Sequence, residues 1–182
     1  MNRRCVLSAV GTSALALSGC LNNRTEDGTA EGSGSVGGPS VTISLTHVAG
    51  DEAISLNSDV IRSEITEESP AVIELIAKNE TESAIEYGTG APAPFGALYD
   101  PDSPEAILWN KKYVESQHVE TDGRRITGMN DIGISVRLSP EETRSETYEF
   151  AAPPGRYSIQ RTGNPLTLGE ETYELDITVS ET

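Results

Sequence analysis

Strict alternation of apolar and polar residues near the C-terminus is the feature that most constrains this fold. Over 172–179 the apolar positions are Tyr173, Leu175, Ile177 and Val179, and a polar residue separates each from the next. Side chains alternate between the two faces of a β-strand, so this period of two predicts a strand with one buried face. Shorter runs of the same kind occur at 41–47, 60–66, 71–79, 85–87, 97–99, 107–109, 134–138, 148–150 and 157–159.

Turn-forming residues separate these runs, as in Pro153-Pro154-Gly155, and no segment shows sustained helical periodicity. Short strands joined by turns, without intervening helices, are typical of antiparallel sandwiches. The sequence therefore predicts an all-β, antiparallel immunoglobulin-like β-sandwich of about seven to nine strands. We expect it to form one domain over residues 41–182.

The N-terminus has the form of a lipoprotein signal. A short basic start is followed by an apolar run over 6–17, which is shorter than the roughly 20 residues that cross a bilayer. The signal residues are Arg3, Arg4, Leu17, Ser18 and Gly19, and Cys20 follows them. We expect cleavage after residue 19 and a lipid on Cys20, which would hold the protein on the extracytoplasmic face of the cell membrane. The alternative is an uncleaved membrane helix.

Arg3 and Arg4 also resemble the pair of a twin-arginine export signal, although Cys5 follows them where such signals often have an aromatic or aliphatic residue. An ordinary secretory signal is the alternative. The composition of residues 20–40 predicts a flexible, acidic, Gly/Ser-rich tether. Within it, 32–37 formally matches a dinucleotide-binding GxGxxG, but neither a strand nor a helix flanks it, so we interpret it as linker.

The chain is strongly acidic, with 29 Asp and Glu residues against 13 Lys and Arg and a formal net charge of −16. Nucleic-acid binding requires clustered positive charge and is excluded as a function. An acidic surface also repels anionic lipid headgroups, so attachment to the membrane would depend on the lipid on Cys20. The composition resembles that of secreted lipoproteins of halophilic archaea, which implies stabilisation by salt. An ordinary acidic secreted protein, or a partly disordered one, is the alternative.

Cys5 and Cys20 are the only cysteines. Once the signal is removed and Cys20 is lipidated, the folded part has no disulfide, no thiol nucleophile and no thiolate ligand. A blue-copper site, which needs a cysteine, is therefore excluded.

Three segments resemble secreted immunoglobulin-like sandwiches, among them the intracellular proteinase inhibitor family of Gram-positive bacteria. They are 73–79, the turn 139–143 with Tyr148-Glu149-Phe150, and 154–159. The resemblance implies a sandwich and, as one possible function, inhibition of a secreted protease. Glu141 stands where that pattern usually has a glycine. Tyr157 lies where a tyrosine-corner residue would, with an ordinary core tyrosine as the alternative.

The sequence offers no grouping typical of catalysis. His47 and His118 are the only histidines, and there is no GxSxG motif. His47 continues the apolar face of 41–45, which favours a packed or rim residue over a ligand. His118 has Glu115 and Glu120 as possible partners. We therefore expect no enzyme activity and no cofactor.

Two weaker patterns point to modification or metal binding. Asp100, Asp102 and Glu105 gather carboxylates in one loop, which is compatible with a calcium site although the EF-hand spacing is absent. Asn23 and Asn79 each begin a glycosylation sequon.

The long segment 110–130 lacks clear alternation and contains several of the few basic residues. Long loops at the end of a sandwich often carry binding function. With 88–96 it would form a partner-binding surface whose candidate residues are Phe95, Tyr113, His118, Arg124 and Arg125. In the structural alternative, Tyr113 lies in another strand and Phe95 covers the core.

The sequence thus favours a lipid-anchored, non-catalytic binding or structural module, whose partner is an unidentified protein or cell-envelope component. A proteinase inhibitor and a calcium-linked adhesin are the alternative functions.

Overall fold

A computed structural model describes residues 38–181, which fall within one compact unit. The predicted signal, Cys20 and the sequon at Asn23 lie outside the described residues. Within 38–181 no helix has the length and apolar character needed to span a bilayer.

Thirteen strands and one short helix make up this part of the chain. They are β1 (Ser40–Ala49), β2 (Ile54–Arg62), β3 (Ala71–Asn79), β4 (Ile85–Thr89), β5 (Leu98–Asp100), β6 (Ser103–Ile107), α1 (Lys112–Glu115), β7 (Val119–Asp122), β8 (Arg125–Met129), β9 (Ile134–Leu138), β10 (Thr143–Phe150), β11 (Gly155–Arg161), β12 (Leu166–Leu168) and β13 (Glu171–Ser180). The predicted all-β, antiparallel sandwich is confirmed. The strand number exceeds the expected seven to nine, in part because the short strands β7, β8 and β12 form outside the segments where alternation predicted strands.

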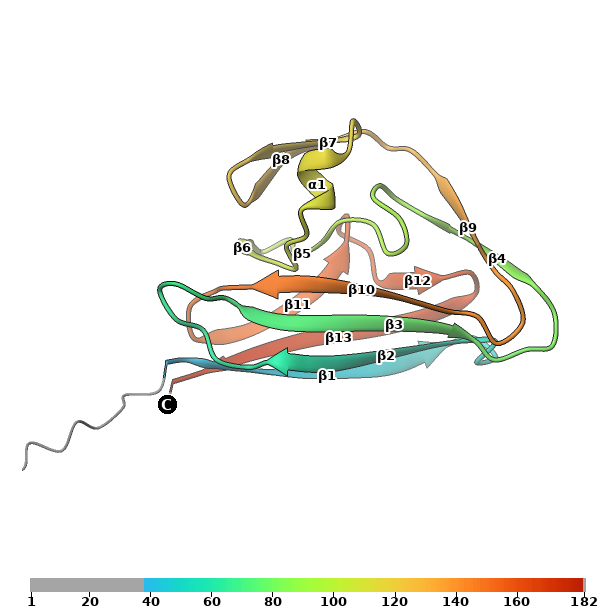
Figure 1. Cartoon of the computed structure of the whole chain (residues 1–182), viewed down its shortest axis with the longest axis horizontal. Coiled ribbons are helices and arrows are strands. Elements are labelled where there is room, and N and C mark those ends of the chain that lie inside the picture. The colour runs from blue at the N-terminus through green and yellow to red at the C-terminus, as the bar shows by residue number, and fades with distance from the viewer. Residues whose placement is uncertain (1–37, 182) are drawn as a thin grey trace, which may run out of the picture. The chain divides into compact units, whose positions relative to one another are not determined.

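The strands form two main layers, which Figure 1 shows one behind the other. The larger sheet has the order β1-β13-β11-β5-β6, and β12 pairs with β13. The facing sheet has the order β10-β3-β2, and β4–β9 and β7–β8 form two separate antiparallel pairs. At one edge the layers meet, where the Val41 N–H donates to the Ser63 carbonyl over 2.8 Å.

The core lies between these sheets and follows the predicted alternation. In β3 every second residue from Ala71 to Asn79 is buried, and in β13 every second residue from Glu171 to Val179 is buried. Full burial of one Leu or Ile side chain contributes roughly 1.5–3 kcal/mol. These two central strands therefore supply much of the stabilisation in a fold without a disulfide.

The turn before β11 is a tyrosine corner, as the sequence suggested. The Tyr157 hydroxyl donates to the Pro153 carbonyl over 2.7 Å, and its ring lies edge-on to Phe150 with centroids 5.9 Å apart. Glu141, where the resembling family usually has glycine, has φ +58°. The turn thus keeps a left-handed residue without a glycine, and Glu141 pairs there with Lys78 at 2.9 Å.

Two local expectations need correction. The strand predicted at 60–66 is displaced, because β2 pairs with β3 from Ile54 opposite Asn79 and ends at Arg62 after a bulge. The region 110–130 is not one long loop. It folds into α1 and the β7–β8 hairpin, and the Asn110 side-chain oxygen accepts the Lys112 N–H over 2.8 Å at the start of the helix.

Candidate functional site: a polar pocket beside Arg161

Three connecting segments line an open hollow of about 550 Å³. They are the end of β4 with the residues after it (88–91), the connection from β8 to β9 (129–133) and the turn between β11 and β12 (161–164). A volume of this size is typical of sites for small molecules. The sequence analysis paired 88–96 with 110–130, and the structure does bring 88–91 beside residues at the C-terminal end of that second region.

Strand pairing explains why these segments meet. β4 and β9 are antiparallel, with Gly88 opposite Ser135 and Thr89 opposite Ile134, so the residues after β4 lie beside those before β9. The third segment is a tight turn in which Arg161 and Asn164 exchange backbone hydrogen bonds of 2.9 and 3.0 Å. Thr162 and Gly163 both have positive φ there, which reverses the chain at the rim of the pocket.

Arg161 is the basic residue of this pocket, and it is half-buried. One terminal nitrogen, Nη1, donates to the Thr167 carbonyl over 3.0 Å and, at 3.4 Å, to the Gly88 carbonyl and the Thr89 hydroxyl. The other, Nη2, donates to the Thr167 hydroxyl over 2.7 Å. All four acceptors are neutral, and no carboxylate of residues 38–181 pairs with this guanidinium. Burial lowers the pKa of Arg161.

The pocket lies far from the point where the chain enters the sandwich. Ser40, at the start of β1, pairs with Ser180 at the C-terminal end of β13. β11 runs in the opposite direction, with Gly155 opposite Val179 and Ile159 opposite Leu175, so Arg161 lies toward the other end of β13. Figure 1 shows the C-terminus at the lower left and the β11–β12 connection on the upper side.

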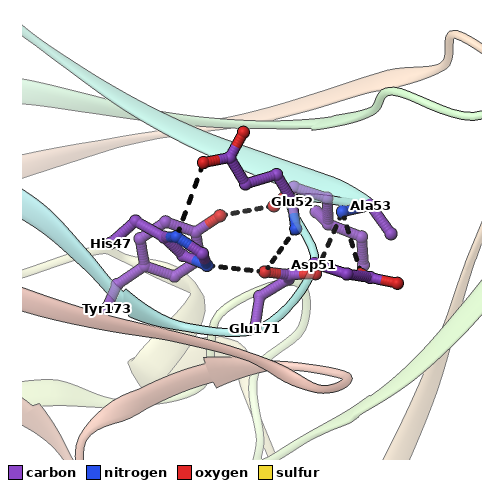
Figure 2. Close-up of polar contacts among 7 residues, drawn as sticks. His47, Asp51, Glu52, Ala53, Glu171 and Tyr173 are labelled. Carbon is purple, nitrogen blue, oxygen red and sulfur yellow. Dashed lines mark hydrogen bonds and ion pairs between the residues drawn. The ribbon is translucent and has the colours of Figure 1, made fainter.

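A second polar cluster surrounds Glu171, which is only 1% exposed (Figure 2). His47 lies 2.7 Å from its Oε2 through Nε2, and the Glu52 N–H donates to the same oxygen over 3.1 Å. The Ala53 N–H donates to Oε1 over 3.0 Å. The ring of His47 also packs beside that of Tyr173, at 5.2 Å between centroids.

The surroundings of Glu171 show that it fixes the connection between β1 and β2, which crosses from one sheet to the other. Desolvation opposes ionisation of this carboxyl, but the contact with His47 and the hydrogen bonds from the Ala53 and Glu52 N–H groups outweigh it and lower its pKa. Gly50 has φ +120°, and a Cβ at this position would lie 2.1 Å from Glu171 Oε2. Both carboxylate oxygens contact His47 or the backbone of the β1–β2 connection, so the cluster is structural. His47 is accordingly a half-buried, packed residue, as expected from its place on the β1 face.

Two adjoining hollows, of about 450 and 330 Å³, lie between β6 and β8 and share Pro104, Ile107 and Arg125. Arg124 lines the first, pairs with Glu149 and lies 5.8 Å from the centre of the Trp109 ring. The structure thus places Arg124 and Arg125 at one surface. His118 lies apart from them and contacts Gln117 rather than Glu115 or Glu120.

The expectation that Phe95 and Tyr113 are exposed anchors is wrong, because both side chains are fully buried. The Tyr113 hydroxyl donates to the Leu108 carbonyl over 2.9 Å and accepts the Leu98 N–H over 3.3 Å. Phe95 belongs to the core, as the structural alternative held, whereas Tyr113 lies in α1 rather than in a strand.

The predicted calcium site is also wrong. Asp100 is buried, and its two oxygens accept the N–H groups of Asp102 and Ser158, each over 2.9 Å. This carboxylate therefore stabilises the loop and joins it to β11. Across residues 38–181, no three His, Cys, Asp or Glu side chains gather closely enough to hold a metal ion, so Asp102 and Glu105 do not converge with it.

The sequon at Asn79 is not a glycosylation site in this fold, since the side chain is fully buried. Its Nδ2 donates to three carbonyls, those of Ser83, Leu138 and Ser139, over 2.7–3.3 Å. Its Oδ1 accepts both the N–H and the hydroxyl of Thr81, each over 2.9 Å. The amide is thus the centre of a turn, and Thr81 belongs to the same network.

The described residues define an antiparallel β-sandwich with a polar pocket among the loops at one side. The chain belongs to a family described as a domain of unknown function, DUF8130, whose model matches residues 1–170. No curated protein and no solved structure gives a significant match.

Arg161 and Glu171 were both missed by the sequence reasoning. The sequence could have indicated Glu171. It lies on the same strand face as the apolar residues Tyr173 and Leu175, and it is the one charged residue on that face of 171–179. Arg161 offered only a weak signal, a base directly before the turn residues Thr162-Gly163-Asn164.

Proposed function

We propose that this protein is a lipid-anchored extracytoplasmic binding module without catalytic activity. The single observation that carries the proposal is the separation between the chain entry at Ser40 and the pocket beside Arg161, which lie toward opposite ends of β13. With Cys20 fastened to a membrane, the chain would approach the sandwich from one end and present the pocket at the other.

The acidic charge supports this arrangement. A net charge of −16 gives the surface no attraction for anionic headgroups, so the lipid would hold the protein while the sandwich stays off the bilayer. The exposed loops around the pocket are then accessible to a protein or cell-envelope partner.

The anchoring test uses the full chain expressed in a host that processes lipoproteins. The wild-type protein should partition with membranes and, by mass spectrometry, begin at a lipidated Cys20. Cys20→Ser should release it to the soluble fraction, whereas the matched control Cys5→Ser should change neither property. A membrane-bound Cys20→Ser protein with an intact Met1 would contradict the proposal.

The binding test places a photo-activated cross-linker at Asn164, on the pocket rim, and in a second variant at Asn57, an exposed residue of β2. Irradiation of intact cells should give a cross-linked product from position 164 and none from position 57. Equal products from both positions, or turnover of substrates by the purified chain, would refute a pocket-centred binding module.

Protease inhibition remains a second candidate, because an inhibitor needs an exposed loop and the β7–β8 hairpin provides one. Residues 122–125, at the β7–β8 turn, are exposed, and Gly123 reverses the chain there with φ +58°. An inhibitor should keep this hairpin intact during incubation with a co-secreted protease and slow that protease. Rapid cleavage at 122–125 would exclude this candidate.

A further inference from the structure

We propose that the pocket beside Arg161 binds a small organic ligand through its carboxylate, received on the free edge of the Arg161 guanidinium. This inference rests on the proposed binding function and adds to it the chemical class of the ligand.

The hydrogen-bond pattern of Arg161 leaves one complete binding edge unused. A guanidinium carries five N–H groups, arranged so that pairs of them form parallel forks. Thr167 occupies the end-on fork, since its carbonyl accepts from Nη1 and its hydroxyl from Nη2. Within residues 38–181, neither the Nε–H nor the second Nη2 hydrogen has an acceptor. These two form the side-on fork, which matches the two oxygens of a carboxylate.

The direct partners of Arg161, all of them neutral, favour an anion at this fork. Five other basic residues of the described chain contact a carboxylate, namely Lys78, Lys112, Arg124, Arg144 and Arg156. Arg161 is more buried than any of the three arginines among them and has only neutral partners. A half-buried charge that contacts no counter-charge is unfavourable, and this chain has 29 acidic residues from which a partner could have come.

The size and lining of the pocket indicate an organic carboxylate rather than a bare halide. Its volume of about 550 Å³ is far larger than a single ion requires. The Asn130 side chain lines it and makes no hydrogen bond within the described residues, so its amide is free to bind the rest of a ligand. Asp131 is the one acid of the lining and is exposed, which selects against ligands carrying several negative charges.

Gly90 lines the pocket, and a larger side chain at this position should reduce the space available to a ligand without changing Arg161. A Cβ added at Gly90 would meet no atom within 4 Å, and the backbone there does not have a glycine-only φ. Gly90→Leu should therefore project a side chain into open space and leave the fold intact.

The test measures binding of N-acetylalanine to the purified full chain by calorimetry at constant ionic strength, beside its amide, which lacks only the charge. The acid should bind and the amide should bind at least about tenfold more weakly, the loss typical of a charge-assisted contact. Arg161→Gln should weaken binding of the acid by a similar factor, and Arg161→Lys should weaken it by less. Gly90→Leu should remove binding. Arg137→Gln, at an exposed arginine of β9, is the matched control and should change nothing.

Several outcomes would overturn the inference. These are equal binding of acid and amide, no binding of the acid, tighter binding of chloride or sulfate than of the acid, or unchanged binding in Gly90→Leu. If Arg161→Gln does not fold, the comparison of acid with amide and the Gly90→Leu variant still decide the matter. Cross-linking at Asn164 without any preference for the acid would leave the binding module standing and reject the carboxylate alone.

Discussion

At the scale of one residue, the Asn79 side chain holds several segments together through its hydrogen bonds. Its amide is fully buried and joins the end of β3 to the turn at 81–83 and to the segment after β9. Both halves of the amide are needed, because the nitrogen faces three carbonyls and the oxygen faces two donors of Thr81. A carboxylate of the same shape would place oxygen against those carbonyls.

Asn79→Asp should therefore destabilise the protein by about 3 kcal/mol, since buried acceptors would lose their donor and meet a second acceptor. Chemical denaturation measures the change in the free energy of unfolding. Asn57→Asp, at an exposed position of β2, is the control and should cost less than about 0.5 kcal/mol. Similar values for both variants would contradict the assigned role of the Asn79 amide.

Tyr87, in contrast to Asn79, is a buried residue whose polar group lacks a hydrogen bond within the described part of the chain. It is 2% exposed, and its hydroxyl is the one buried side-chain polar atom of residues 38–181 without a hydrogen-bond partner. Burial raises its pKa to about 12. A buried polar group without a partner costs about 1–3 kcal/mol, so Tyr87→Phe should leave stability unchanged or raise it by up to about 1 kcal/mol. A loss of more than 1 kcal/mol in a thermal melt would show that this hydroxyl has a partner.

At the scale of elements, the connection from β1 to β2, which crosses between the two sheets, depends on a residue from a strand far along the chain. Glu171 lies in the first position of β13 and accepts two backbone N–H groups of the turn at 50–53. Tyr173 adds a second tie, because its hydroxyl donates to the Ile54 carbonyl. The geometry of the turn at 50–53 is thus set by tertiary contacts as well as by its own sequence.

The contacts of Glu171 predict how the stability of the protein depends on pH. Because the folded-state pKa of Glu171 is lowered from its ordinary value of 4.5, ionised Glu171 contributes stability above that value. The contribution is lost as the pH falls through the lower folded-state pKa. Glu171→Gln should destabilise the protein at neutral pH by about 2–4 kcal/mol, and its difference from wild type should shrink below pH 4.5.

The exposed neighbour Glu170 provides the control, since Glu170→Gln should leave the curve of stability against pH almost unchanged. Denaturation at a series of pH values measures both variants. A constant difference between Glu171→Gln and wild type across the acid range would assign the effect to packing instead of charge.

At the scale of the whole molecule, acidic residues exceed basic ones so far that local ion pairs cannot balance the charge. Lys78 contacts two acids, Glu80 and Glu141, at 2.5 and 2.9 Å, and most other pairs lie at the surface. Exposed pairs contribute little, typically below about 1 kcal/mol. The remaining repulsion acts over distances that salt can screen.

The unfolding midpoint should therefore rise by several degrees between about 0.1 M and 1 M salt, as the Debye length falls from roughly 10 to 3 Å. Calorimetry in sodium chloride measures it. The triple variant Glu67→Gln/Glu68→Gln/Glu82→Gln removes exposed acids and should show a smaller rise. A midpoint independent of salt would remove the support for adaptation to high salt.

The sequence by itself determined the class of fold, because the period of two in 71–79 and 172–179 reports burial of one strand face directly. It also suggested the corner at Tyr157, with an ordinary core tyrosine as the alternative, because that pattern depends on residues close together in the chain; the hydroxyl contact with Pro153 decided between the two. Only the tertiary structure showed which polar residues form the Glu171 cluster and the Arg161 pocket. The His47–Glu171 contact joins residues 124 positions apart, and the Arg161 pocket joins three loops that strand pairing brings together. Burial of Phe95, Tyr113 and Asn79 likewise depends on what packs over them, and a single sequence carries no record of those distant neighbours.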